Sequence, residues 1–433
     1  MHEEAQRRVN KLQWLAERAK ADKEMRFENL IYLIDERALH EAYRRTRKGG
    51  ASGIDGQTGA QYGEHLDENI RDLITRLKQG RYRAPAVRRA WIPKENGEKR
   101  PLGVPTFEDK VLQRAVVALL DVIYEQDFKE CSYGFRPGRS AHDALRALRE
   151  QCYRNRVSWV VDVDIKGFFD SIDHGVVREL LQRRIADRSI QRLVGKWLNA
   201  GVLEGGELIH PETGTPQGGV ISPLLANICL NYILDEWFIA EVQPRLKGRS
   251  FLIRYCDDFV IGCEYEQDAR RVMTVLPKRM NKYGLKLNEG KTRLVPFERP
   301  VGGSKGRGTF NFLGFTHYWG KTRNGYWVIK RKTARRRLQR TLKRIAEWCK
   351  THRHRPLAAQ ARVLSQKLRG HYQYFGIYCN ARSLKTVYYW TVRTWRYWLN
   401  RRDNTRRMSW ERFTTIVLRC FPLPVPRVVH SWM

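Results

Sequence analysis

The sequence has no apolar run long enough to cross a membrane and few acidic residues for its size. None of its hydrophobic stretches approaches 18 residues and its start lacks a signal-peptide core, so we expect a cytoplasmic protein with no membrane partner. Its eight cysteines show no paired short spacing, which argues against a zinc ribbon and a disulfide framework. Acidic residues number 46 against 81 lysines and arginines, leaving a formal charge of +35. A chain this basic is expected to bind polyanions.

The positive charge is concentrated in the last quarter of the chain. Residues 321–433 contain 28 of the 81 basic residues and only three acids. There, Leu338, Leu342 and Ile345 recur at helical spacing among cations, which predicts an amphipathic basic helix. Its predicted RNA-binding residues are Arg335, Arg336, Arg337, Arg340, Lys343 and Arg344. A solvated basic face and a membrane-surface helix are the alternatives, and interleaved aromatic residues favour RNA.

Two adjacent carboxylates, Asp257 and Asp258, lie between the apolar runs 251–253 and 259–261. Side chains alternate along a strand, so both can serve one site only where the chain turns, and the pattern predicts a hairpin. An exposed acidic turn is the alternative. Upstream, the segment 159–165 alternates so that Asp164 faces away from its apolar side chains. Carboxylates gathered in this way are suited to Mg²⁺.

A turn and a helix are predicted directly after that first strand. Gly167 interrupts the strand pattern, and Asp173 stands where a helix N-cap is expected, before His174. A carboxylate is thus expected at the point where a strand gives way to a helix.

At this point the residues carry a family resemblance. Three segments agree in order and spacing with group II intron reverse transcriptases, namely Asp164–Asp170 (DIKGFFD), Gly214–Pro223 (GTPQGGVISP) and Tyr255–Asp258 (YCDD). Further similar segments are Ile92–Lys94, Arg100–Pro105, Ser132–Ser140, Gly284–Thr292 and Phe310–Phe315. The chain therefore resembles the bacterial intron-encoded reverse transcriptase/maturase, in its short type without an endonuclease domain.

The resemblance implies an α+β fold. We expect a right-hand polymerase, with fingers and an antiparallel palm sheet, followed by an α-helical thumb or maturase domain. The implied domains are an N-terminal extension with a template-binding insertion at 1–80, fingers and palm at 81–320, and the basic helical domain at 321–433.

The resemblance also implies site residues. Asp164, Asp257 and Asp258 match the catalytic carboxylates, and with Ile165 they would hold two Mg²⁺ ions, for which Mn²⁺ can substitute. The implied nucleotide-binding residues are Lys94, Arg100, Phe169, Gln217 and Lys291. Phe169 would exclude a ribose 2′-hydroxyl, whereas the alternative is core packing. Lys94 and Arg100 would contact the triphosphate, and solvated surface charges are the alternative.

Gln217 has a further alternative, Lys291 has a specific implied role, and one residue departs from the family. Gln217 would lie against the sugar or form a structural turn, and Lys291 matches a lysine proposed as a general acid toward pyrophosphate. Cys256 occupies a position where relatives more often carry alanine or another small residue, and we expect a passive packing group.

The implied function is RNA-directed DNA polymerisation coupled to splicing and retrohoming of a group II intron. The expected partners are intron RNA or another RNA template, a DNA or RNA primer and deoxynucleoside triphosphates, with nucleoid association when the protein acts on DNA. One alternative is a splicing chaperone without polymerase activity. Another is a domesticated reverse transcriptase in phage defence, CRISPR spacer acquisition or DNA repair.

Overall fold

The fold is described from a computed structural model that covers residues 2–93, 99–204, 207–209, 218–301, 306–402 and 407–431. The chain divides into two compact units. Unit 1 comprises residues 1–147 and 163–294, and unit 2 comprises residues 148–162 and 295–433. The division passes through three elements, α6, β3 and β8.

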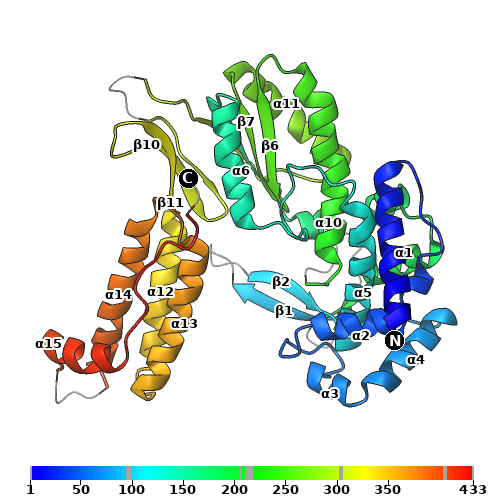
Figure 1. The fold of residues 1–433 in the computed structure, drawn as a ribbon, viewed down its shortest axis with the longest axis horizontal. Coiled ribbons are helices and arrows are strands. Elements are labelled where there is room, and N and C mark those ends of the chain that lie inside the picture. The colour runs from blue at the N-terminus through cyan, green and yellow to red at the C-terminus, as the bar shows by residue number, and fades with distance from the viewer. Residues whose placement is uncertain are drawn as a thin grey trace. The chain divides into compact units, whose positions relative to one another are not determined.

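Unit 1 is built from helices around two sheets (Figure 1). Its helices are α1 (His2–Ala21), α2 (Glu36–Arg45), α3 (Gly59–Glu64), α4 (Leu66–Lys78), α5 (Phe107–Tyr124), the first half of α6 (Ala141–Arg154), α7 (Phe168–Ser171), α8 (His174–Gln182), α9 (Arg188–Leu198), α10 (Ser222–Leu230) and α11 (Glu266–Lys282). Short helical turns are η1 (Ile31–Leu33), and η2 (Asn231–Glu236), η3 (Phe238–Val242) and η4 (Gln243–Arg245), which continue α10.

Short polar side chains start several of these helices. Asp173 accepts a hydrogen bond from the main-chain N of Val176 (3.0 Å) and caps α8, as the sequence predicts. Thr106 caps α5 in the same way through the main-chain N of Asp109 (3.3 Å). The capped ends fix where α5 and α8 begin.

The first sheet of unit 1 has the strand order β2-β1-β4-β5. Its strands are β1 (Val87–Pro93), β2 (Lys99–Val104), β4 (Val202–Glu204) and β5 (Glu207–Ile209). β1 and β2 are antiparallel, with Ile92 opposite Arg100 and Pro93 opposite Lys99, whereas β1 and β4 are parallel. The residues between the two strands, 94–98, lie outside the described residues.

The second sheet has the order β6-β7-β3-β8. Its strands are β3 (Trp159–Asp164), β6 (Ser250–Tyr255), β7 (Asp258–Cys263) and β8 (Arg293–Pro296). β6 and β7 are antiparallel, and almost every side chain of this pair is buried. Figure 1 shows α11 running beside this pair. Burial on both faces explains why the two strands read as continuous apolar runs rather than as alternating ones.

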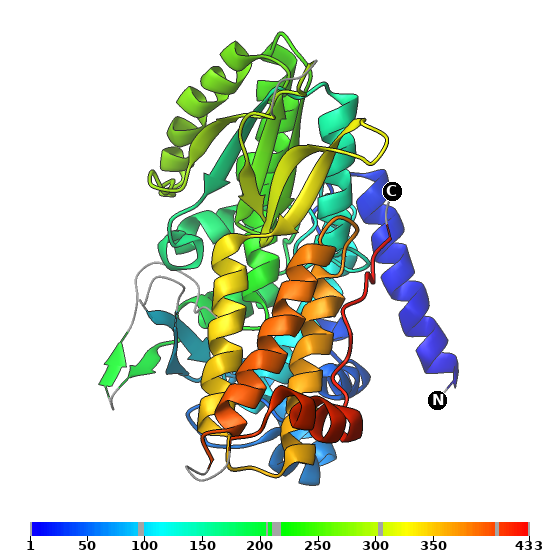
Figure 2. The ribbon, with the colours of Figure 1, turned by 90° about the vertical axis from the view of Figure 1, so that its left-hand side faces the viewer.

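Unit 2 contains a three-stranded antiparallel sheet and a bundle of helices (Figure 2). The strands are β9 (Phe310–Phe312), β10 (Phe315–Lys321) and β11 (Trp327–Thr333), and the helices are α12 (Arg335–Thr351), α13 (Leu357–Phe375), α14 (Ala381–Leu399) and α15 (Trp410–Arg412), continued by η5 (Phe413–Leu418). Leu364, Val387, Trp395 and Phe413 are among the buried residues of the bundle core. The stretch 327–333, which the sequence analysis places in a helical domain, is a strand, and the helices begin at Arg335.

Helices and antiparallel strand pairs confirm the α+β class. The right-hand arrangement and the domain limits at 80/81 and 320/321 stay predictions, although residue 320 lies inside β10. Over the part of the chain that the structure describes, no helix is both long enough and apolar enough to span a bilayer.

Candidate active site

Asp257 and Asp258 lie at the turn of the β6–β7 hairpin. Tyr255 pairs with Asp258 across the hairpin, so the turn consists of Cys256 and Asp257 alone. Cys256 has a φ of 59°, in the left-handed region, and its side chain is buried. Burial, followed by the neighbouring Asp257 carboxylate, raises the pKa of the Cys256 thiol to about 12. The thiol therefore stays protonated at neutral pH, which fits a packing group better than a nucleophile.

Asp164 ends β3, next to β7 in the same sheet. The main-chain O of Asp164 accepts a hydrogen bond from the main-chain N of Asn288 (2.8 Å), and its Oδ2 accepts one from Asn288 Nδ2 (3.0 Å). Lys291 Nζ lies 2.9 Å from Oδ2 and 3.1 Å from Oδ1. Ile165, the predicted fourth metal ligand, forms a bridge with Leu287. The segment 287–291 therefore holds the end of β3 and neutralises its carboxylate.

The pKa of the Asp257 carboxyl is raised. Burial is the main cause, and the negative charge of Asp164 adds to it, whereas the main-chain N–H of Asp257 and the cation of Arg100 act in the opposite direction. The carboxylates of Asp164 and Asp257 therefore repel each other electrostatically, and the cation of Arg100 on β2 partly offsets the negative charge at Asp257. Such mutual repulsion is typical of carboxylates that share a cation.

The three aspartates do not form a ready-made metal cage. Among the residues that the structure describes, no three Asp, Glu, His or Cys side chains are close enough to hold one ion. Instead, Lys291 forms an ion pair with Asp164 and so supplies its counter-charge. The donor set is nevertheless composed of carboxylate oxygens, which Mg²⁺ prefers.

Phe169 lies in α7, directly after the turn that follows β3. Gly167 precedes α7 with a φ of 56°, a conformation that glycine adopts at little cost. Phe168 is buried, whereas Phe169 is only partly buried and meets the ring of Phe168 edge-on, with centroids 5.5 Å apart. Phe168 is therefore the core residue of the pair, and Phe169 retains surface that a ligand can contact.

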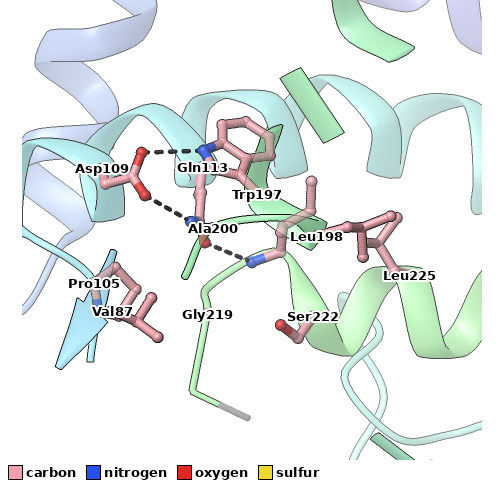
Figure 3. A pocket seen from close by; sticks show the side chains of 11 residues that line it. Val87, Pro105, Asp109, Gln113, Trp197, Leu198, Ala200, Gly219, Ser222 and Leu225 are labelled. Carbon is pink, nitrogen blue, oxygen red and sulfur yellow. Dashed lines mark hydrogen bonds between the residues drawn. The ribbon is translucent and has the colours of Figure 1, made fainter. Parts of the chain in front are cut away.

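Two predicted nucleotide-binding residues, Lys94 and Gln217, lie outside the described residues. Ile221, four residues after Gln217, is held by a series of buried hydrogen bonds (Figure 3). Ile221 N donates to Gln113 Oε1 (3.3 Å), and Gln113 Nε2 donates to Asp109 Oδ2 (3.2 Å). Trp197 Nε1 donates to Asp109 Oδ1 (3.0 Å). Asp109 thus connects α5, α9 and the start of α10.

The Asp109 carboxyl itself is buried. Burial raises its pKa to about 6, although the hydrogen bonds that it accepts from Tyr82, Trp197 and Gln113 lower it. The sequence does not mark Asp109 as buried, because an acid inside an amphipathic helix gives no local sign of burial.

A buried ion pair beneath the hairpin also escaped the sequence analysis. Arg254 and Asp235 are both fully buried, and Arg254 Nε donates to Asp235 Oδ1 (2.8 Å). The same guanidinium donates to Asn227 Oδ1 (2.9 Å) and to the main-chain O of Cys256 (3.1 Å). The sequence offered one sign of it, since Arg254 is a charged residue inside the apolar strand β6. The pair connects η2 to the turn that carries Asp257.

In unit 2, α12 presents the predicted basic residues. Arg335, Arg336, Arg337, Lys343 and Arg344 are exposed and Arg340 is partly so. On the opposite side of the helix, Ile345 is buried, and Leu338 and Leu342 pack against the bundle core. The amphipathic basic helix is therefore confirmed, whereas its RNA contacts stay a prediction.

Comparisons with known proteins agree with these features. The family described as "Reverse transcriptase (RNA-dependent DNA polymerase)" matches residues 92–317, more than half of the chain. Protein YkfC of Escherichia coli is 39% identical over 279 residues, which cover 57% of this chain and 73% of YkfC. Group II intron-encoded protein LtrA of Lactococcus lactis is 43% identical over 223 residues, covering 51% of this chain and 36% of LtrA. A 91 kDa protein in a cob intron of Schizosaccharomyces pombe is 38% identical over 185 residues, covering 43% of this chain and 22% of that protein.

Proposed function

Because the chain belongs to the reverse transcriptase family and is related to group II intron-encoded proteins, we propose that it extends a primer 3′-hydroxyl with deoxynucleotides along an RNA template. The observation that supports this most directly is the placement of Asp164 and the Asp257–Asp258 turn on neighbouring strands of one sheet. The alternative of a passive splicing chaperone would not require Asp257 to be kept in an unfavourable electrostatic environment.

The carboxylates fit a divalent cation. Mg²⁺ bound to Asp164, Asp257 and Asp258, with Ile165 beside them, would activate the primer hydroxyl and neutralise charge on the triphosphate. The cost of burying Asp257 next to Asp164 would then be offset by the cation. For Asp164 to become a metal ligand, Lys291 has to release it.

The surrounding side chains are suited to a nucleotide. Arg100 already contributes positive charge at Asp257, and we assign it to the triphosphate. Phe169, partly exposed beside the turn after β3, would stand against the sugar and exclude a 2′-hydroxyl. Lys291, once released from Asp164, has an exposed ammonium with which to meet phosphate. Lys94 and Gln217 complete the proposed set.

The biological role that we propose is the splicing and mobility of a group II intron. The exposed basic face of α12 would bind intron RNA through its phosphates. The intron-encoded relatives support this role, whereas a domesticated role in defence or repair would use the same chemistry on another RNA.

The test is primer extension on an RNA template with Mg²⁺ and deoxynucleotides. We expect the parent protein to extend the primer and a variant carrying Asp257→Ala and Asp258→Ala to lose extension while keeping its RNA affinity. Glu266→Gln, which removes an exposed acid in the first turn of α11, is the matched control and should extend normally. A parent that folds and binds RNA but extends no primer would refute the polymerase and favour the splicing chaperone.

A further inference from the structure

An exposed aromatic ring stands beside the β6–β7 turn in a conformation that its residue type disfavours. Phe135 has a φ of 55°, in the left-handed region, and its side chain is 61% exposed. A bulky residue is a true outlier there, and such strain persists only where the surroundings impose it. Burial does not explain the ring, because most of its surface faces solvent.

The residues on both sides of Phe135 fix its backbone. Arg136 is buried, and its Nε and Nη2 donate to the Glu125 carboxylate at 3.1 and 2.9 Å. The main-chain O of Gly134 accepts a hydrogen bond from Asn227 Nδ2 (2.7 Å). A Cβ on Gly134 would lie 2.5 Å from the main-chain N of Cys256, so only glycine allows this close approach to the turn. The strained residue is therefore held against the turn that carries Asp257.

A second ring lies next to it. The rings of Phe135 and Tyr255 have centroids 6.5 Å apart and planes inclined by 41°. Tyr255 is the last residue of β6 and is partly buried. Two aromatic side chains, one of them mostly exposed, thus border the turn.

We propose that Phe135, with Tyr255 beside it, forms a platform on which the base of the terminal primer nucleotide stacks. This proposal rests on the proposed polymerase function, since it places the primer terminus at the Asp257 turn. Every base has an aromatic face, so stacking holds a strand without reading its sequence, as a polymerase requires. The residues assigned to the incoming nucleotide, Arg100 and Phe169, belong to β2 and α7, whereas Phe135 lies against the hairpin.

The experiment uses the full chain and primer–template duplexes that carry 2-aminopurine, whose fluorescence reports stacking. The probe is placed either at the primer 3′ end or at the first unpaired template base, and no nucleotide is added. We expect the parent to change the fluorescence of the primer-end probe. Phe135→Ala should abolish that change and weaken duplex binding about 5- to 100-fold, the effect of losing one base stack. Phe135→Tyr should restore both.

Phe135→Gly separates stacking from folding. Glycine tolerates the left-handed backbone, so the melting temperature of this variant should equal or exceed that of the parent while its duplex affinity falls as in Phe135→Ala. Tyr265→Ala is the matched control, because Tyr265 is 51% exposed and follows the opposite end of β7. It should leave affinity and fluorescence unchanged.

The outcomes distinguish this proposal from the polymerase itself. If Phe135→Ala extends primers and keeps the duplex affinity and the primer-end fluorescence change of the parent, the platform is overturned and the polymerase stays intact. A response confined to the template probe would overturn the assignment to the primer strand. A further outcome is a parent that extends no primer and still shows the primer-end fluorescence change, with Phe135→Ala losing that change. This result would refute the polymerase and keep the platform. A parent that binds no duplex would refute both.

Discussion

The buried pair of Arg254 and Asp235 allows the sharpest quantitative prediction. Arg254→Met removes the only cation that Asp235 is seen to contact among the described residues, and leaves a carboxylate buried in the core. Breaking a buried pair in this way costs about 3–5 kcal/mol of unfolding free energy. Replacing both residues, as Arg254→Met with Asp235→Leu, removes the uncompensated charge and should recover most of that loss.

The assay is a double-mutant cycle of urea unfolding followed by tryptophan fluorescence, with primer extension measured on the same proteins. The double variant should be stable yet extend primers roughly 10- to 100-fold more slowly, because the carbonyl of Cys256 loses the donor that holds the turn carrying Asp257. Arg270→Met, which removes an exposed i,i+4 partner of Glu266 on α11, serves as the control and should change stability by less than about 0.5 kcal/mol. A cost below about 1 kcal/mol for Arg254→Met, or no recovery in the double variant, would refute the reasoning.

Three further predictions concern other parts of the chain. Phe169→Val should raise ribonucleotide incorporation by removing bulk beside the sugar, and unchanged sugar selectivity in competition assays with intact polymerisation would reassign Phe169 to the core. The pKa of Asp109 is about 6 against an ordinary 3.8, so the folded state binds the proton more tightly than the unfolded state does. The free energy of unfolding should therefore fall by up to about 3 kcal/mol as pH rises from 3.8 to 6. Asp109→Asn should lose this dependence in urea unfolding measured at several pH values, and an unchanged profile would contradict the assignment. Replacing Arg335, Arg336 and Arg337 by glutamine should make the affinity for duplex RNA less dependent on salt. The slope of log affinity against log salt should become shallower by up to about 0.9 for each phosphate that these side chains neutralise. An unchanged slope would exclude the three arginines from the RNA interface.

Local patterns predicted the elements that carry the site. The apolar runs around Asp257 and Asp258, the glycine at 167 and the cap at Asp173 each act over a few residues, and the structure places them in a hairpin, a left-handed turn and a helix start. Local propensity and periodicity are sufficient for features of this kind.

The supports of the site could not be predicted in this way. Asn288 reaches Asp164 across 124 residues and Asp109 reaches Trp197 across 88, so both contacts depend on the tertiary fold. The strand β11 was missed because Arg331 occupies a buried position on it, which breaks the alternation of apolar and polar residues that marks a strand.

The ion pair of Lys291 with Asp164 has a thermodynamic consequence. One ammonium cannot neutralise Asp164 and a bound triphosphate to the full extent at the same time. A cation that takes over Asp164 would free Lys291 for phosphate, and a triphosphate that attracts Lys291 would free Asp164 for the cation. If Mg²⁺ and a nucleotide bind as proposed, linkage makes this effect reciprocal: the factor by which Mg²⁺ tightens nucleotide binding must equal the factor by which the nucleotide tightens Mg²⁺ binding. In Lys291→Met both factors should shrink together.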